Sequence, residues 1–412
     1  MKALNKVIQL TLIGLFLLSL NIAYSQVSNS GYTFTMVKQI KTTPVKNQQS
    51  TGTCWSFATT SFIETELLRL GQPEYDLSEI FFARCAYTEK ANLYVRFNGT
   101  NNFGQGGQAH DVFNVVKKYG LATEEAYSGK NYGSNDHNHG EIDAVLKAYV
   151  DAIIKKEGGK ITTAWTGAFE SILDAYFGKI PTEMTVNSKK ISPKSFLEST
   201  GLKLEDYVEI TSFNHHPFYQ SFILEIPDNW ARAQYYNVPL DELMAIIENS
   251  LMKGYSVCWD GDVSEKGFAY KKGVAILPAS KVEDLKNTDM SRWTEVAEKD
   301  RISQMFSFEK PVPEVNVTQE NRQLNFDNQT TTDDHLMHLV GIATDQNGVK
   351  YYYTKNSWGI DYGTENQIYN GYLYMSEPFV RMKTIAILVH KDAIPVEIAM
   401  KMGIVKTRSA VK

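Results

Sequence analysis

The feature that most constrains the fold is a series of short apolar runs near the C-terminus. These runs are rich in β-branched and aromatic residues and are separated by Asn-Gly and other glycine-containing turns: LMHLVGIAT, KYYYTKNSW, GYLYMS and TIAILVH. Segments of this length and composition predict the strands of an antiparallel sheet. The C-terminal part of the chain is therefore expected to be β-rich.

The first part of the chain has helical periodicity instead. From Cys54 to Leu70, apolar residues recur near helical spacing until Gly71, which predicts a buried helix whose first turn contains Cys54. The run from Ala109 to Gly120 predicts a second, amphipathic helix with a glycine cap. Helices followed by an antiparallel sheet predict an α+β fold, with a cleft where the two parts meet.

Between these parts, helical stretches such as PLDELMAIIENSLMKG alternate with aromatic-rich loops, without an internal repeat or a low-complexity linker. We expect a mainly helical insertion here. The predicted division of the chain is a signal peptide, an N-terminal helical part, the insertion, a β-rich part and a C-terminal arm: 1–25, 26–140, 141–300, 301–392 and 393–412.

Composition excludes some classes of partner. The chain has 412 residues, 43% of them hydrophobic and 22% charged, which is ordinary for a folded protein with a large core. Its formal net charge of -5 gives no electrostatic reason to expect binding to nucleic acid or to an anionic membrane.

The N-terminus predicts export. Lys2 and Lys6 precede the apolar stretch LTLIGLFLLSL, and the small residues Ala23 and Ser25 come just before Gln26. This is the pattern of a cleaved secretory signal peptide, and the apolar stretch is too short to span a membrane. We therefore expect a periplasmic or extracellular protein that has no membrane segment after cleavage.

The cysteines do not form a disulfide framework. Cys85 and Cys258 could form one bridge at most, which would leave Cys54 free. A free thiol in an oxidising compartment suggests a chemical role. The alternative for Cys54 is a small buried structural thiol.

The surroundings of Cys54 favour a nucleophile. The positive end of a helix dipole and unpaired backbone N–H groups favour the thiolate at this position. The Gln48 side chain can fold back across the loop that contains Gly52 and, with the Cys54 N–H, form a two-donor oxyanion hole. Trp55 is expected to pack the start of the helix into the core.

A nucleophilic thiol needs a base and a group that orients it. HLMHLVGIA offers His335 and His338, and we choose His338 because it opens the apolar run and can face the cleft from a strand. KNSWG supplies Asn356 to hold the imidazole tautomer and Trp358 to shield their hydrogen bond from water. His335 is expected to lie before the strand, outside the site.

These motifs resemble a known family. NQQSTGTCWSFA, GGQAHDVFNVVKKYGL, HLVGIATD and KNSWGIDYG followed by NGYLYMS resemble the papain-like cysteine peptidases. The long separation between Cys54 and His338, with GYSVCWDGDVSEKGF before the histidine, is similar to the bleomycin hydrolase and aminopeptidase C branch. The resemblance covers nearly all of the chain after the signal peptide and implies a papain-like fold.

The resemblance also implies roles for individual residues. Cys54 would be the nucleophile, His338 the general base and acid, Asn356 the orienting residue and Gln48 the oxyanion donor. Substrate-binding residues would be Gly106, Gly107 and Trp358. Peptide hydrolysis through a thioester follows, with a Cys54–His338 ion pair and no metal or organic cofactor.

Exopeptidase and endopeptidase action stay open at this point. In the resembled branch the C-terminal arm lies in the cleft, and its terminal carboxylate receives the substrate's α-amino group. Here the arm ends at Lys412 and is basic, which would weaken that attraction. We expect an aminopeptidase acting on oligopeptides. The alternatives are an endopeptidase with an open cleft and a non-catalytic binding protein of the same fold. A hexamer is implied by resemblance.

Several other residues receive structural roles. His137, His139, His215 and His216 are expected to be solvated loop residues, and no metal site is expected. Asp260 and Asp262, close to Cys258, are expected to cap a loop, with cleft lining as the alternative.

Overall fold

The computed structural model describes residues 26–27, 30–156, 159–279, 281, 298–362, 365–366 and 368–404. The predicted signal peptide, 1–25, and the end of the predicted arm, 405–412, lie outside the described residues. None of the described helices is long and apolar enough to cross a membrane.

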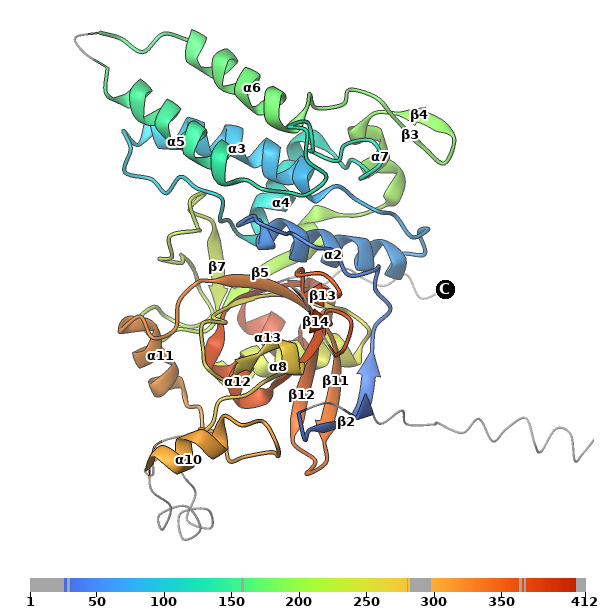
Figure 1. Ribbon diagram of the computed structural model, residues 1–412, viewed down its shortest axis with the longest axis vertical. Coiled ribbons are helices and arrows are strands. Elements are labelled where there is room, and N and C mark those ends of the chain that lie inside the picture. The colour runs from blue at the N-terminus through green and yellow to red at the C-terminus, as the bar shows by residue number, and fades with distance from the viewer. Residues whose placement is uncertain are drawn as a thin grey trace, which may run out of the picture.

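The N-terminal part is helical and forms the upper part of Figure 1. Its helices are α2 (Cys54–Arg69), α3 (Glu79–Arg96), α4 (Ala109–Tyr119), α5 (Gly140–Ile154), α6 (Ala164–Phe177) and α7 (Pro193–Thr200). The predicted helices at 54–70 and 109–119 are confirmed. Helix α2 lies between the upper helices and the sheet and contacts β11, so Cys54 is at the boundary of the two parts.

The C-terminal part is built on one large sheet. Its path runs β6-β7-β5-β16-β8-β11-β12-β15-β10-β9, with β2 pairing β11 and β1 pairing β2. The strands are β1 (Gln26–Val27), β2 (Thr33–Gln39), β5 (Tyr207–Thr211), β6 (Ser221–Ile223), β7 (Gln234–Asn237), β8 (Val257–Gly261), β9 (Phe268–Ala269), β10 (Val274–Ala275), β11 (His335–Asp345), β12 (Lys350–Lys355), β15 (Tyr372–Ser376) and β16 (Thr384–His390).

Smaller elements complete the described residues. Two hairpins stand apart from the sheet: β3 (Met184–Val186) with β4 (Lys189–Ile191), and β13 (Asp361–Tyr362) with β14 (Glu365–Asn366). The remaining helices are α8 (Leu240–Met252), α10 (Glu298–Met305), α11 (Gln319–Asp327), α12 (Glu377–Lys383) and α13 (Val396–Lys401). Short 3₁₀ turns occur at 204–206, 270–272 and 391–393.

The predicted α+β class is confirmed, as are strands at the four C-terminal apolar runs. The expectation of a mainly helical insertion over 141–300 is wrong for its second half. Residues 207–275 supply six strands of the large sheet, β5 to β10, as well as helix α8. Pairing with β16, β11 and β15 organises this segment, and such long-range pairing has no signature in local periodicity.

Two apolar clusters lie on either side of the central strands. One contains the N-terminal helices together with Leu336, Leu388 and Cys258. The other contains α8 and α12 residues together with Met337, Leu339 and Trp259. Alternate residues of β8 and β11 therefore enter different clusters, as the period-two geometry of a strand requires.

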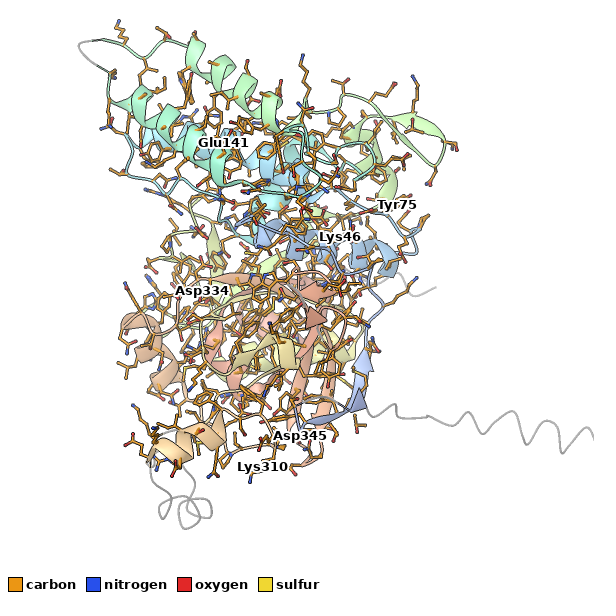
Figure 2. The ribbon with its side chains drawn as sticks, viewed as in Figure 1. Lys46, Tyr75, Glu141, Lys310, Asp334 and Asp345 are labelled. Atoms are coloured by element: carbon orange, nitrogen blue, oxygen red, sulfur yellow. The ribbon has the colours of Figure 1, made fainter. Side chains whose placement is uncertain are left out.

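The chain segment before Cys54 is tied to the segment after β12. Asn47 bridges Trp358, the Gln48 N–H donates to the Ser357 carbonyl, and the Gly359 N–H donates to the Lys46 carbonyl. Figure 2 shows Lys46, just before the segment with Gln48 and Cys54, and Asp334, just before His335. Both lie near the level where the helices and the sheet meet. Residues far apart in the sequence are thus brought to one place.

The core role of β11 predicts a large cost for truncating it. Leu339 is fully buried, so Leu339→Ala is expected to lower the free energy of unfolding by about 2–5 kcal/mol. Leu324 is 60% exposed on α11, so the matched change Leu324→Ala is expected to alter it by no more than about 0.5 kcal/mol. Urea unfolding measures both, and equal effects would contradict the burial assigned to β11.

Candidate active site

Cys54 begins helix α2 with its thiol half-buried. The N-cap residue Thr53 makes no side-chain hydrogen bond to the first turn, and the Ser56 N–H of that turn donates to the Thr53 carbonyl. A hydrogen bond from the Leu336 backbone to the thiol links Cys54 to strand β11. Cys54 therefore lies at the start of a helix, as predicted. The strand residue that bonds to its thiol, Leu336, directly follows His335 in the sequence.

His335 and Asn356 are hydrogen-bonded partners. His335 Nε2 lies 2.8 Å from Asn356 Oδ1, and both side chains are buried. The Trp358 indole packs against the His335 ring, with 4.8 Å between ring centroids and 30° between planes. The predicted roles of Asn356 as orienting residue and Trp358 as shield thus fall on His335.

The network also defines the histidine tautomer. The Ser357 backbone N–H donates to Asn356 Oδ1 at 2.7 Å, which identifies that atom as the amide oxygen. An oxygen can only accept here, so His335 Nε2 carries the proton that it donates to Asn356. His335 Nδ1 is left as the basic nitrogen of the neutral ring.

The expected placement of the two histidines is wrong. His335 is the first residue of β11 and does not lie before the strand. His338 is fully buried, and its Nδ1 bonds to Ser61 Oγ at 2.9 Å instead of to Asn356. Its ring packs edge-on against Phe62 of helix α2, with centroids 5.9 Å apart.

Strand geometry explains this arrangement. Residues three apart on a strand point to opposite faces, so His335 and His338 cannot both face Asn356. His338 is paired directly with Lys355, so the next residue, Asn356, projects to the other side. Burial and then the charge of Lys355 hold the pKa of His338 well below its usual range, which keeps that ring neutral.

Gln48 is held in place by a residue that the sequence reasoning passed over. Ser357 Oγ donates to Gln48 Oε1 at 2.6 Å, and Gln48 Nε2 donates to the Thr51 carbonyl at 2.8 Å. One N–H of the Gln48 amide remains for a further acceptor. Ser357 was visible within the KNSWG motif, but only the contact shows that its hydroxyl orients the predicted oxyanion donor.

The glycine-rich loop lies against the start of α2. A Cβ on Gly107 would come within 3.0 Å of the Trp55 ring and 2.8 Å of Asp111 Oδ2, and one on Gly106 would come within 2.0 Å of Asp228 Oδ2. Trp55 Nε1 also donates to the Gln105 carbonyl at 2.8 Å. A larger residue at 106 or 107 would force these side chains to shift, and the role of both glycines in substrate binding stays a prediction.

Burial controls the ionisation of Cys54 and of His335. It raises the pKa of Cys54 to about 12 and lowers the pKa of His335 to about 4. Each group by itself therefore favours its neutral form. Transfer of the thiol proton to His335 would create two opposite charges, whose attraction at the positive end of α2 opposes both desolvation costs.

The outcomes differ among the other residues that the sequence singled out. His137 and His139 are buried, so the expectation of solvated loop residues is wrong for them. Cys85 and Cys258 are both free thiols, and the bridge that they could have formed is absent. Asp262 accepts hydrogen bonds from the Ser264 N–H and hydroxyl and caps its loop as expected. Asp260 makes no such cap.

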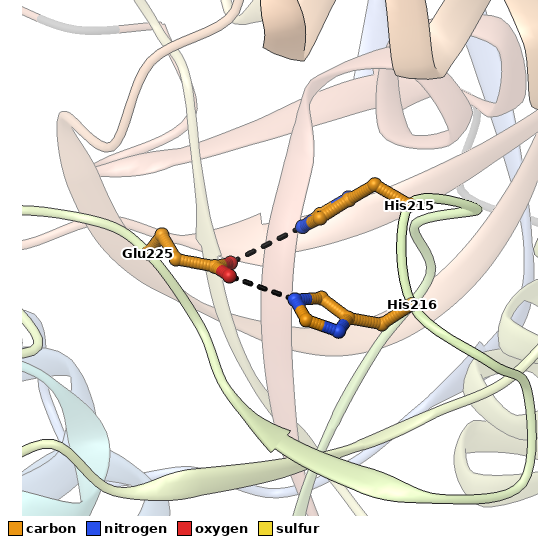
Figure 3. A group of neighbouring side chains, drawn as sticks. All are labelled: His215, His216 and Glu225. Carbon is orange, nitrogen blue, oxygen red and sulfur yellow. Dashed lines mark hydrogen bonds and ion pairs between the residues drawn. The ribbon is translucent and has the colours of Figure 1, made fainter.

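Among the residues that the structure describes, one group of His and Glu side chains lies close enough together to be considered as a metal site. Figure 3 shows His215 and His216 both directed at Glu225, with distances of 3.1 and 2.7 Å. Gln323 Oε1 accepts from the Asn214 N–H, so Gln323 Nε2 is the donor to His215 Nδ1. The proton of His215 is then on Nε2, facing Glu225, where a metal would need a lone pair. The two histidines therefore form hydrogen bonds to Glu225 and not a metal site.

Comparison with known proteins identifies the family. The family model described as "Papain family cysteine protease" matches residues 33–187, and the one described as "Peptidase C1-like family" matches residues 182–307 and 294–405. The chain therefore belongs to the C1-like family of papain-type cysteine peptidases, as the sequence motifs indicated.

Its relatives include bacterial enzymes named as aminopeptidases. Aminopeptidase C of Listeria innocua is 22% identical over 87% of this chain and 83% of its own length. Aminopeptidase E of Lactobacillus helveticus is 22% identical over 90% and 86%, respectively. A crystal structure of PepW from Lactobacillus rhamnosis matches with a TM-score of 0.65 and 17% identity, covering 90% of this chain and 84% of that one.

The Ser357–Gln48 contact predicts a positioning effect. Without the Ser357 hydroxyl, the Gln48 amide loses the donor that holds its oxygen, so Ser357→Ala is expected to lower kcat for peptide hydrolysis about tenfold with little change in KM. Gln48→Ala is expected to lower kcat about 10²–10³-fold. Steady-state kinetics measures both, with Ser171→Ala on exposed helix α6 as control. A normal kcat in Ser357→Ala would remove Ser357 from the site.

Proposed function

We propose that this protein is an exported aminopeptidase that cleaves oligopeptides through a thioester on Cys54, with His335 as general base and acid. The observation that carries this assignment is the buried His335–Asn356 hydrogen bond, shielded by Trp358, on the residue next to the Leu336 backbone that contacts the thiol. The names of the bacterial relatives support aminopeptidase action.

The chemistry follows from the tautomer. His335 Nδ1 accepts the Cys54 proton, and the thiolate attacks the carbonyl carbon of the scissile bond. The negative charge on the carbonyl oxygen is received by the Cys54 N–H and by the remaining N–H of Gln48. The tetrahedral intermediate collapses as His335 gives its proton to the leaving amine, which breaks the C–N bond and leaves a thioester.

Deacylation reverses these roles. Water gives a proton to His335 Nδ1 and attacks the thioester carbonyl, and the second tetrahedral intermediate expels the Cys54 thiolate. Throughout, Nε2 of His335 stays bonded to Asn356 Oδ1, so the ring keeps its orientation in both half-reactions. His335 mediates every proton transfer in this cycle.

The two histidines provide the test of the assignment. His335→Ala is expected to lower kcat by about 10³-fold or more, because the thiol loses its base, while the fold is retained. His338→Ala removes a buried bond to Ser61 and is expected to lower the melting temperature while kcat stays within about tenfold of wild type. Cys54→Ala is the inactive reference.

The assay pairs alanyl-aminomethylcoumarin with its N-acetylated form. Preference for the free amine supports an aminopeptidase, and equal cleavage of the two would point to an endopeptidase. Full activity in Cys54→Ala would exclude the thioester mechanism. Full activity in His335→Ala, together with loss in folded His338→Ala, would return the role of base to His338.

Export and assembly form a separate prediction. Lys2, Lys6 and the apolar stretch that follows support a cleaved signal peptide, and the resembled branch supports a hexamer. Expressed with its own leader in a bacterial host, the protein is expected in the periplasm or medium, with Gln26 as the first residue by intact-mass analysis. Light scattering is expected to give six subunits. Recovery of a cytoplasmic chain starting at Met1, or of a monomer, would contradict the respective proposal.

A further inference from the structure

Three carboxylates from separate segments converge beside Cys54. Asp260 is on strand β8, Asp333 comes just before β11, and Asp228 lies in the loop between β6 and β7. After burial, which is the largest cause, these three carboxylates are what raises the pKa of the Cys54 thiol. None of them takes part in the proposed proton transfers, so they call for another explanation.

Strand register places Asp260 on the thiol side of the sheet. Asp260 of β8 pairs directly with Leu336 of β11, and the Leu336 backbone bonds to the Cys54 thiol. Paired residues project to the same face, and Cys258, two residues earlier on β8, packs there against Thr59 of helix α2. The carboxylate of Asp260 therefore lies between the helical part and the sheet, where the thiol also lies.

The glycine-rich loop brings the other two carboxylates to the same place. Asp228 touches Gly106 so closely that a Cβ there would come within 2.0 Å of Asp228 Oδ2. Asp333 accepts hydrogen bonds from Gln108 Nε2 at 3.1 and 3.0 Å. Gly107, between these residues, packs on the Trp55 ring that follows the nucleophile.

Asp260 is a buried carboxyl group that is hydrogen-bonded to a second carboxyl group. Its side chain is only 3% exposed, and its carboxyl group interacts with two side chains: a hydrogen bond from Gln108 lowers its pKa, and one shared with Asp333 raises it. Burial, then the charge of Asp333, raises the pKa of Asp260 well above its usual range, and burial raises the pKa of Asp333 to about 7. A buried carboxylate in this situation is costly unless a cation or a proton joins it.

The lysine whose charge acts on Asp228 is already engaged. Lys90 is buried, and its ammonium donates to the carbonyls of Gly104 and Gly106 beneath the loop. Its charge does lower the pKa of Asp228. His110, a second group that could carry positive charge, is paired with Glu209. The Glu209 carboxylate oxygens lie 3.0 and 3.1 Å from His110 Nδ1. Neither cation is bonded to Asp260 or Asp333, whose raised pKa values indicate that this pair retains a proton that an ammonium group could replace.

We propose that Asp260, Asp333 and Asp228 form the site that binds the α-ammonium group of the peptide substrate. This inference rests on the proposed function and adds the group that recognises a free amino terminus. An ammonium has three N–H donors and a full charge, which matches three acceptor side chains in a site of low polarity. A substrate residue anchored there would present its carbonyl carbon to the neighbouring thiol.

This site needs no chain terminus. Its three residues belong to the folded sheet and loops, whereas the C-terminal carboxylate of Lys412 lies outside the described residues. A chain that ends at Ile404 is therefore expected to keep the preference for free amino termini. If truncation abolishes the preference instead, the anchor is the C-terminal carboxylate, and the inference is overturned.

The decisive variants change one carboxylate each. Asp260→Asn and Asp333→Asn are expected to raise KM for alanyl-aminomethylcoumarin about 10- to 100-fold, the range for a lost bond to a charged group. Cleavage of the N-acetylated substrate is expected to change less than about threefold, which also shows that the variants fold. Asp228→Asn, at a half-buried position, is expected to give a smaller change of the same kind.

The matched control is Asp334→Asn, which makes the same carboxyl-to-amide change at an exposed neighbouring residue and is expected to leave both KM values unchanged. Unaltered preference in Asp260→Asn and Asp333→Asn, or equal losses in Asp334→Asn, would overturn the inference. The inference would also be overturned if wild type cleaved an acetyl-lysyl-alanyl substrate faster than an acetyl-alanyl-alanyl substrate. The carboxylates would then bind a basic side chain and not the α-ammonium group.

Failure of this inference is distinguishable from failure of the proposed function. If wild type cleaves neither the free nor the acetylated substrate and alkylation of Cys54 has no effect, the proposed function fails. If wild type prefers free amines and loses activity on alkylation while the Asn variants keep that preference, only the carboxylate site is refuted.

Discussion

The register between β11 and its two neighbours is the constraint on which the site depends. Pairing of His338 with Lys355 and of Leu336 with Asp260 decides which side chains share a face. A shift by one residue would exchange the two faces. It would turn His335 away from Asn356 and remove Asp260 from the thiol side of the sheet. The same register therefore determines the base, its orienting residue and the carboxylates beside the nucleophile.

His338 has a different task in the same strands. Lys355 Nζ donates to Ser61 Oγ at 2.8 Å, so the Ser61 hydroxyl hydrogen is free to donate to His338 Nδ1. Lys355 also donates to Thr43, which in turn donates to the buried Glu64 of helix α2. This chain of bonds joins α2 to β11 and β12. A buried network of this kind favours one relative position of the elements, because other positions would leave its polar groups unpaired.

The sequence was sufficient for some parts of this arrangement and insufficient for others. The helix from Cys54 and the four C-terminal strands were predictable because each has a clear local period. The choice of His338 failed because the start of an apolar run does not define strand register. The alternation of faces along a strand allows only one of the two histidines to face Asn356, but it does not say which one. Strands β5 to β10 and the meeting of Asp228, Asp260 and Asp333 depend on long-range pairing, which no local pattern contains.

The position of the carboxylates links substrate recognition to the reactivity of the thiol. Negative charge near Cys54 opposes formation of the thiolate, so an unoccupied carboxylate site adds to the desolvation cost that already keeps the thiol protonated. An ammonium bound at Asp260 and Asp333 would neutralise part of that charge and lower the free energy of the thiolate–imidazolium pair. A substrate with a blocked amino terminus brings no such charge. In the proposed site, the group that identifies the correct substrate would therefore also help to ionise the nucleophile that attacks it, because both effects act through the same few carboxylates.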